Sequence, residues 1–561
     1  MPKRLTSVVG THTPARDLST SVLVVGGGPV GLSLAMDLAW RGIDVVVAEL
    51  RPAGEAPSVK CNHVAARTME IFRRLGLAGQ VRNAGLPDDY PNDVVFRTRA
   101  TGHELARIPI PCRSDRYSET RGPDCGWPTP EPAHRINQIY FEPILFRHAT
   151  AMPHLRALNR TRIETTRQDD DGVVAVARDL ATGERYTIRS SYLVGCDGGR
   201  SEIRRAIGAR LTGDEVIQRV QSSYIHAPQL RDLITPPRAW MSYLYNPERQ
   251  GNLVAIDGMD RWLLHNYLLP HEGDFESVDR DRCIRALLGV GSDFRYQLLN
   301  KEDWIGRRLV ADRFRDRRMF ICGDAAHLWV PYAGYGMNAG IADAMNLSWQ
   351  LAAHLNGWAP DSILNAHERE RHPITEQVSR FAMKHAQGAI QERTTLPVEL
   401  EEDSPAGIAA RTAVGEAAYT LNVQQFACAG LNFGYYYDGS PLIAYDGEAH
   451  PAYTMHDYQA STVPGCRTPH FWLSDGRSLY DAMGPDYTLL RLDSRLDVEP
   501  LQAAAALRRV PLAVLDATSR GDLPAVYRHK LLLSRPDQHV AWRGDQLPAD
   551  PLALVDRIRG A

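Results

Sequence analysis

Short apolar segments and one helical repeat open the chain. Residues 21–25 form an apolar stretch of strand length, residues 32–41 repeat apolar side chains at helical spacing, and residues 44–49 form a second apolar stretch. Such a strand–helix–strand unit opens a doubly wound nucleotide-binding fold. The pattern therefore predicts an α/β protein with a Rossmann-like first domain.

Two later apolar stretches, residues 192–196 and 319–322, are expected to extend the same sheet, and a helical pattern follows the second of them. Between them, residues 210–310 alternate apolar and polar side chains in several places, which is typical of strands with one buried face. We therefore expect a discontinuous first domain over residues 20–400, into which a mostly antiparallel sheet is inserted at about residues 210–310.

The pattern changes after residue 400. Acidic residues cluster at 399–403 just before a proline, and residues 401–479 are expected to form a linker and a helical connection. Residues 480–561 then contain apolar strand patterns with a helical repeat between them. They are expected to fold as a small separate α/β domain.

Composition and charge exclude several classes of partner. The 561 residues carry a formal net charge of −3, so no basic field attracts nucleic acid or an anionic membrane. No apolar run is long enough to span a bilayer, and the polar N-terminus lacks the apolar core of a signal peptide. The 8 cysteines form no C-x-x-C pair and no metal-ligand spacing, so we expect reduced thiols, no metal and a cytoplasmic protein.

A glycine-rich turn follows the first predicted strand. Gly26, Gly28 and Gly31 have the G-x-G-x-x-G spacing, which allows a tight turn, a close approach to pyrophosphate and close packing of helix on strand. The helix that begins there offers free N–H groups and its positive dipole end to phosphates. Glu49 ends the next strand, where an acid accepts hydrogen bonds from ribose hydroxyls. These features predict a dinucleotide site.

Two further carboxylates, Asp197 and Asp324, follow predicted strands directly, and open α/β sheets bind ligands at the carboxyl ends of their strands. After Asp324, glycines and the start of a helix allow the backbone to approach a flat ring. The residues of that stretch are Pro331, Gly334, Gly336, Met337 and Asn338. Taken alone, each stretch also fits an ordinary turn.

The order and spacing of these three motifs resemble the single-component FAD-dependent aromatic hydroxylases, in the branch of phenol hydroxylase and hydroxybiphenyl hydroxylase. The segment Arg67-Thr-Met-Glu70 is also familiar from that class. So is Asn137-Gln138, where family members place a glutamine against the flavin. The resemblance covers about residues 20–385 and makes the inserted sheet the substrate domain.

The resemblance implies a bound FAD that NADPH or NADH reduces after docking transiently, since the sequence has no second dinucleotide fingerprint. Reduced flavin then adds O2, and its C4a-hydroperoxide hydroxylates a small aromatic, phenolic substrate. The residues implied at the cofactor are Gly26, Gly28, Gly31, Glu49, Arg51, Gln138, Asp197, Asp324, Pro331, Gly334, Gly336, Met337 and Asn338.

The resemblance continues more weakly at residues 459–470, which are similar to the stretch leading into the last domain of that branch. That domain has a thioredoxin-like fold in the family. Here it has no C-x-x-C pair, so dithiol chemistry is excluded. A structural or dimer-supporting role is expected, and a homodimer is left open.

A phenol must lose its proton to become a good nucleophile, and a His or Tyr within hydrogen-bond reach serves as base or relay. Tyr243, Tyr245 and His265 on the inserted sheet are candidates, and His63 is a candidate near the flavin. Each residue on the sheet also fits the plainer interpretation of filling space there.

Two bulky residues near the expected flavin edge, Tyr332 and Tyr335, are expected to shape the pocket. Two other functions stay open at this point. One is a Baeyer–Villiger-type flavin oxygenase on the same scaffold, and the other is a non-catalytic flavoprotein redox sensor. The sequence contains no W-x-W-x-I-P segment, which argues against a halogenase.

Overall fold

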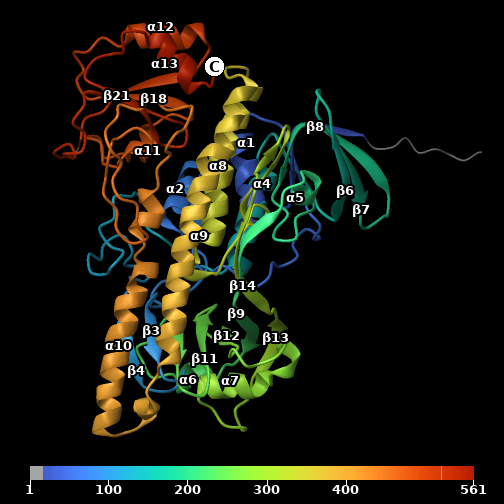
Figure 1. Ribbon diagram of the computed structural model, residues 1–561, viewed down its shortest axis with the longest axis vertical. Coiled ribbons are helices and arrows are strands. Elements are labelled where there is room, and N and C mark those ends of the chain that lie inside the picture. Colours follow the sequence, from blue (N-terminus) through green and yellow to red (C-terminus); the bar gives the residue numbers. More distant parts are fainter. Residues whose placement is uncertain (1–16, 520) are drawn as a thin grey trace, which may run out of the picture.

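The computed structural model describes residues 17–519 and 521–561. Most of the polar N-terminal segment considered above lies outside these residues. Three sheets and a set of long helices make up the described chain (Figure 1). Among the described residues, no helix has the length and apolar character needed to cross a bilayer.

The first sheet is mainly parallel and carries the predicted strand–helix–strand unit. Its strands, in spatial order, are β15 (Arg315–Asp316), β16 (Met319–Ile321), β8 (Arg185–Gly195), β1 (Leu18–Val25), β2 (Val45–Ala48) and β5 (Leu155–Leu158). The antiparallel strands β6 (Thr161–Gln168) and β7 (Val173–Asp179) extend it beside β8. Helices α1 (Pro29–Trp40), α4 (Gln138–Ala151) and α8 (Gly336–Leu355) pack together against it. The α/β fold expected from the opening pattern is confirmed.

The second sheet is mostly antiparallel. In spatial order its strands are β17 (His327–Leu328), β14 (Trp304–Ala311), β9 (Leu211–His226), β12 (Arg261–Tyr267), β11 (Gln250–Ala255), β10 (Met241–Tyr245), β3 (Val94–Arg97) and β4 (Glu104–Ile108), while β13 (Gln297–Lys301) pairs with β9. Strands β3 and β4 come from before the predicted insertion. They join this sheet because β3 pairs in parallel with β10. The apolar pattern did not predict this pairing, since the two strands are far apart in sequence.

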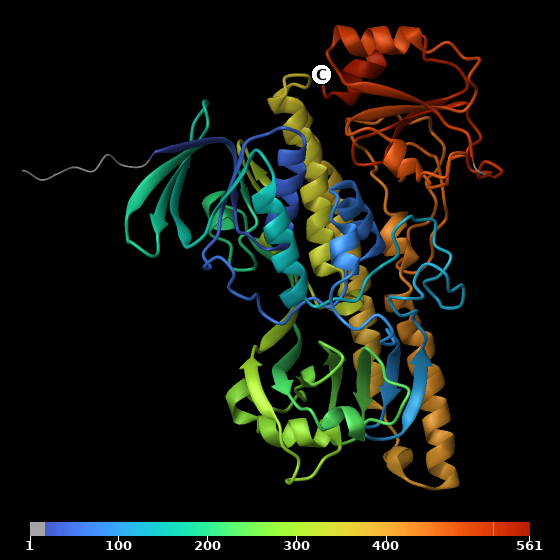
Figure 2. The same ribbon diagram turned by 180° about the vertical axis from the view of Figure 1, so that it is seen from behind.

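Two long helices, α9 (Asn365–Thr394) and α10 (Pro405–Phe426), run beside one face of the second sheet (Figure 1, Figure 2). The acidic cluster forms only the turn between them, and Ser404 then caps α10 by accepting a hydrogen bond from the Gly407 N–H at 3.1 Å. On the other face lie α6 (Leu230–Leu233) and α7 (Arg280–Leu288), and α7 ends at Gly289 in the left-handed conformation. The shorter helices of the first domain are α2 (Ala66–Arg74), α3 (Ala78–Arg82) and α5 (Glu202–Ala206).

The third sheet lies near the C-terminus. It has the order β19 (Leu512–Asp516), β18 (Tyr487–Arg491), β20 (Leu531–Ser534) and β21 (Val540–Gly544), and it is accompanied by α11 (Leu479–Ala482), α12 (Glu499–Leu507) and α13 (Pro551–Ile558). A parallel pair followed by an antiparallel hairpin is the order expected of a thioredoxin-like domain. Its core is continuous with that of the first domain, because Leu489 and Leu531 belong to the same buried cluster as Leu34 and Trp349.

Five histidines with lowered pKa values predict how stability depends on pH. Burial lowers the pKa of each, to about 3 or 4, and they are His134, His265, His367, His385 and His470. A folded-state pKa below the unfolded value of about 6.5 means that the unfolded chain binds more protons, so stability is lost as the pH falls below 6.5. Lowering the pH from 7.5 to 5.5 costs about 1.4 kcal/mol for each such histidine.

We therefore expect the urea midpoint to fall steeply between pH 7.5 and pH 5.5. Asp37 does not offset this loss, because its pKa is lowered to about 2, so the stability it contributes is lost only under more acidic conditions. Urea titrations followed by tryptophan fluorescence at several pH values measure the effect. A midpoint that is constant over this window would show that these histidines are protonated in the folded protein.

Candidate active site

The glycine turn between β1 and α1 has two glycines that the fold itself requires. Gly26 has a φ of +107°, and a β-carbon there would lie 2.3 Å from the carbonyl oxygen of Cys196. A β-carbon on Gly31 would lie 2.0 Å from the carbonyl oxygen of Gly26. Both contacts are far inside van der Waals distance, so these glycines allow the tight turn and the close packing of helix on strand.

Gly28 is different, because the described protein gives no reason for a glycine there. Its backbone is extended, with φ −76° and ψ −178°, and a β-carbon would meet no other atom of the described residues within 4 Å. As the N-cap of α1 it offers no side-chain cap, so the first N–H groups of the helix stay open. This open, donor-rich space fits the pyrophosphate of a dinucleotide.

Glu49 organises the adjoining part of the site. Its Oε2 accepts a hydrogen bond from the Gly27 N–H at 2.7 Å, and its Oε1 accepts from the Arg51 backbone and Nε at 2.9 and 3.0 Å. Arg51 also pairs with Glu142 at 2.5 Å, and Gln138 donates to the same carboxylate at 2.7 Å. Glu49, Arg51 and Gln138, which the sequence placed at the cofactor, thus belong to one network.

Asp324 follows β16 directly, and its side chain is exposed. No hydrogen bond from another described residue engages its carboxylate. Although solvent reaches the group, the surrounding protein raises its pKa by desolvation, an effect that His327 and Lys60 oppose. A carboxylate with free acceptor capacity at the end of a parallel strand fits a hydroxyl of a ribityl or ribose chain.

The loop after this motif is held by Asn338. The side chain of Asn338 accepts hydrogen bonds from the Ala65 N–H at 2.9 Å and from Thr68 Oγ1 at 2.7 Å, and it donates to the Gly334 carbonyl at 2.8 Å. The protein therefore uses its side chain to position the loop. A β-carbon on Gly336 would meet no other atom of the described residues within 4 Å, so at Gly336, as at Gly28, the backbone faces open space.

The other predicted loop residues have different surroundings. Pro331 caps the short turn at Tyr332–Gly334, and Met337 is buried in the main core. His63 packs against Gly334, where a β-carbon would lie 3.1 Å from that of His63. The structure thus brings His63 against this loop, and its position near a flavin stays a prediction.

Asp197 is engaged within the protein. Its carboxylate accepts hydrogen bonds from Ser201 Oγ at 2.5 Å and from the N–H groups of Glu202 and Ile203 at 2.7 and 3.2 Å. It therefore caps α5 at the carboxyl end of β8. Its contact with a cofactor stays a prediction.

The second sheet presents a polar, aromatic face to α9 and α10. Strand pairing places Tyr243, Asn252 and His265 side by side in one row. Tyr243 accepts a hydrogen bond from Gln425 of α10 at 3.4 Å. Burial raises its pKa well above the usual value of a phenol, so Tyr243 stays protonated.

Tyr245 lies farther along the same face and donates to Glu392 of α9 at 2.9 Å. Burial raises its pKa in the same way, so neither tyrosine is a base in this arrangement. Tyr335, expected at the flavin edge, is buried with α9 instead and donates its hydroxyl to the Leu431 carbonyl. That expectation was wrong, because the residue starts α8 with its ring turned into a neighbouring apolar cluster.

His265 is a neutral imidazole with an unpartnered ring nitrogen. Burial lowers its pKa to about 4, so its imidazole is neutral at pH 7. Its Nδ1 is buried and finds no partner among the described residues, and neither does Oδ1 of the neighbouring Asn252. The Asn252 amide is oriented because its Nδ2 donates to the Tyr267 hydroxyl at 2.9 Å. An unpartnered ring nitrogen and an unpartnered amide oxygen therefore lie in the same row of this face.

Arg393 and Glu392 were missed by the sequence reasoning. Both lie near the end of α9, and no motif recognised in the sequence includes them. Arg393 donates to the Tyr332 hydroxyl at 3.3 and 3.4 Å and stacks over the Tyr267 ring at 4.6 Å. It therefore links the loop after the Asp324 motif to the face of the second sheet.

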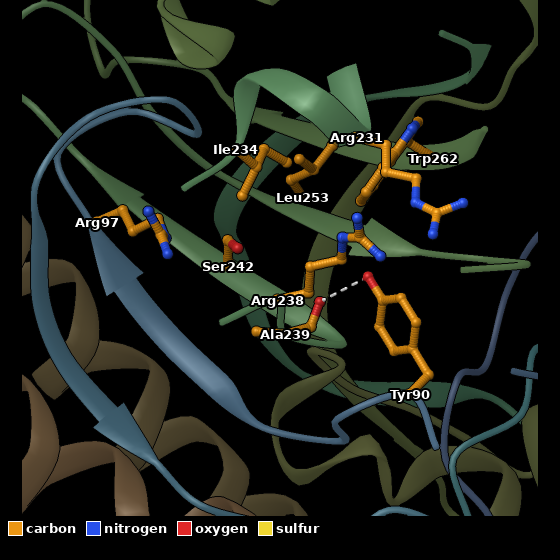
Figure 3. Close-up of a pocket in the computed structure, with 9 residues that line it drawn as sticks. All are labelled: Tyr90, Arg97, Arg231, Ile234, Arg238, Ala239, Ser242, Leu253 and Trp262. Atoms are coloured by element: carbon orange, nitrogen blue, oxygen red, sulfur yellow. Dashed lines mark hydrogen bonds between the residues drawn. The ribbon is translucent and has the colours of Figure 1, made fainter. Parts of the chain in front are cut away.

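A small cavity lies on the opposite face of the second sheet (Figure 3). Its volume is about 10 Å³, which is room for about one water molecule. Ser242, Leu253 and Trp262 line it, and they alternate with Tyr243, Asn252 and His265 along their strands. The cavity is therefore separated by the sheet from the residues described above.

One group of metal-ligand types occurs among the described residues. Asp446, Glu448 and His529 lie within 4.8 Å of one another. Arg543 and Arg528 already pair with the two carboxylates. The arrangement is that of a salt-bridge network near the third sheet.

Replacing Asp324 by alanine is expected to weaken FAD binding without unfolding the protein. The carboxylate makes no hydrogen bond with other described residues, so its loss costs the fold little. A charge-assisted hydrogen bond to a ligand is worth about 1.5–3 kcal/mol, or roughly tenfold to a hundredfold in affinity. Titration of the apoprotein with FAD, followed by flavin fluorescence, measures the change. Unchanged affinity would remove Asp324 from the site.

The chain matches the FAD binding domain family over residues 19–382 and the aromatic-ring hydroxylase C-terminal family over residues 461–560. The tetracenomycin B2 monooxygenase-dioxygenase of Streptomyces olivaceus is 31% identical, over 96% of this chain and 97% of the relative. The phenol 2-monooxygenase of Pseudomonas sp. (strain EST1001) is 29% identical, over 99% and 95%. A structure of the rebeccamycin biosynthetic enzyme RebC with reduced flavin has 34% identity and a TM-score of 0.87, over 97% of this chain and 100% of that one. The open space at Gly28, the free Asp324 carboxylate and these matches agree, and the chain belongs to the family of FAD-dependent aromatic-ring hydroxylases.

Proposed function

We propose that this enzyme hydroxylates a phenolic aromatic compound with O2 and NADPH or NADH. The observation that carries the proposal is the junction at Arg393, where the loop after the Asp324 motif meets the polar face of the second sheet. A ring held between that loop and that face lies next to the place where the loop approaches a flavin. When bound, FAD supplies the redox chemistry and activates oxygen.

The chain's own residues bind and orient the two reactants. The open N–H groups at Gly28 hold the pyrophosphate, and Asp324 accepts from a hydroxyl of the cofactor. On the sheet, His265 Nδ1 accepts from the substrate hydroxyl, which fixes the ring and draws its proton away from the oxygen, and Asn252 Oδ1 lies in the neighbouring position of the row. Helices α9 and α10 run beside this face (Figure 2), and their Glu392 and Gln425 side chains contact its tyrosines, which limits the access of water.

The test substrates should differ in the number of fused rings. Among the relatives, one is named for phenol and another for tetracenomycin B2. A panel that runs from phenol through 2-naphthol to a hydroxylated anthracene covers one, two and three rings. It should be supplied with NADH and NADPH separately.

The test records NAD(P)H oxidation and product mass for the FAD-loaded enzyme with ¹⁸O2. The proposal expects faster NAD(P)H oxidation with at least one phenol and a product heavier by one ¹⁸O atom. Oxygen inserted next to a ketone carbonyl in place of a ring hydroxylation would indicate a Baeyer–Villiger oxygenase. Flavin that NAD(P)H reduces without any oxygenated product would favour the redox sensor.

A pair of variants tests the role of His265. Leucine removes the acceptor, while asparagine keeps an amide oxygen at the same distance along the side chain as Nδ1. We expect His265→Leu to lower kcat strongly while FAD content is unchanged, and His265→Asn to restore part of the rate. Equal rates in both variants and the parent would show that His265 only fills space on the sheet.

A further inference from the structure

A buried cation on α9 lacks an anionic partner. Arg393 is 2% exposed, and its guanidinium makes two long hydrogen bonds within the described residues, both to the phenol oxygen of Tyr332. A guanidinium has five N–H donors, so most of its capacity is unused by these contacts. Within the chain described by the structure, no carboxylate oxygen lies within 4.0 Å of its nitrogens. Buried charges are normally paired, so this arrangement points to a missing anion.

Other deeply buried arginines of this protein show what a paired site looks like. Arg371 is 1% exposed and donates to Asp343 at 2.8 Å. Arg535 is also 1% exposed and pairs with Glu370 at 2.6 Å. Arg393 is as deeply buried as these two arginines. Its guanidinium contacts phenol groups, whereas theirs contact carboxylates.

The adjacent acid does not fill the role. Glu392 is the preceding residue on α9, but its carboxylate receives the Tyr245 hydroxyl at 2.9 Å. Its other oxygen is buried without a partner among the described residues, and burial raises its pKa. The two neighbouring side chains are thus engaged with different groups, and the Arg393 guanidinium remains available to a ligand.

The position of Arg393 identifies the ligand. Its guanidinium lies between Tyr332, in the loop after the Asp324 motif, and Tyr267, on the face of the second sheet. This is the junction at which the substrate ring is expected, so the argument rests on the proposed function. A planar guanidinium with free N–H groups matches a carboxylate, which it binds through two parallel hydrogen bonds. We propose that the substrate is an aromatic carboxylate and that Arg393 binds its carboxylate group.

A second buried arginine provides the matched control. Arg135 is 4% exposed, is absent from the ion pairs of the described residues, and stacks over Trp240 at 4.7 Å and Phe426 at 5.9 Å. Burial lowers its pKa to about 10. It makes no contact with Tyr332 or Tyr267, so its removal tests whether loss of any buried arginine has the same effect.

The experiment compares two probes that differ only in charge, 3-hydroxy-2-naphthoate and 3-hydroxy-2-naphthamide. Their dissociation constants are measured from the change in flavin absorbance of the FAD-bound enzyme. In the parent we expect the carboxylate to bind at least tenfold more tightly than the amide. Arg393→Met should abolish this preference, Arg393→Lys should retain part of it, and Arg135→Met should leave it intact.

Three results would overturn the proposal. In the first, the parent binds the carboxylate no more tightly than the amide. In the second, the preference for the carboxylate survives in Arg393→Met. In the third, Arg135→Met abolishes the preference and Arg393→Met does not. FAD content and the thermal unfolding temperature of each variant show that the fold is intact. Oxygenated product from neutral phenols without any carboxylate preference would sink this inference alone. An Arg393-dependent preference without any oxygenated product would sink the proposed function alone.

Discussion

Replacing Gly28 by valine is expected to give a folded protein that contains no FAD. The backbone of Gly28 is extended, a conformation that valine adopts readily, and the space around it is open in the described protein. The side chain would occupy the space where pyrophosphate must approach the N–H groups of α1. The substitution therefore removes the cofactor site while leaving the apoprotein without a clash.

The measurement is the flavin content of the purified variant, together with its circular dichroism spectrum. Gly79→Val is the matched control, because Gly79 also faces open space but lies in α3, in a segment not predicted to contact the cofactor. We expect the control to retain one FAD per chain. A yellow Gly28→Val protein with the parent's flavin spectrum would refute the placement of the pyrophosphate.

Replacing Glu370 by alanine is expected to destabilise the protein more than any other single change considered above. Glu370 accepts hydrogen bonds from Arg535 at 2.6 and 2.8 Å and from Asn346 at 2.6 Å, and both members of the ion pair have side chains that are 0% exposed. The variant leaves the Arg535 charge with one fewer carboxylate in a buried site. Breaking a buried pair in this way costs about 3–5 kcal/mol.

The pair joins α9 to the hairpin formed by β20 and β21, so we expect the third sheet to detach at lower denaturant concentration. Urea unfolding and limited proteolysis measure the effect. Asp475→Ala is the control, because the pair of Asp475 with Arg477 is largely exposed and contributes little. Equal midpoints for Glu370→Ala and Asp475→Ala would mean that the third sheet is held by its apolar contacts alone.

The third sheet has a structural part in this enzyme. Its apolar residues share one cluster with α1 and α8, and Arg67 of α2 donates to the Asp537 carbonyl at 2.8 Å. The nearest cysteine before this sheet, Cys466, is buried. These contacts attach the third sheet to α1, α2 and α8, and a supporting role without dithiol chemistry stays a prediction.

The sequence by itself determined those features that depend on local backbone geometry. The turn at Gly26 and the packing at Gly31 admit no β-carbon, so their spacing identifies the βαβ unit without knowledge of the rest of the fold. A carboxylate after a parallel strand, as at Glu49 and Asp324, is likewise positioned by a few neighbouring residues. Signals of this kind survive in sequence because the interacting groups are close along the chain.

The proposed substrate side of the site was decided by tertiary structure. Strand pairing placed Asn252 beside His265, and the docking of α9 brought Arg393 between Tyr267 and Tyr332. None of these contacts leaves a periodic pattern, because each joins side chains whose separation in sequence is unrelated to their separation in space. The tyrosines expected to act as bases were assigned by type alone, and only their burial showed that they stay protonated.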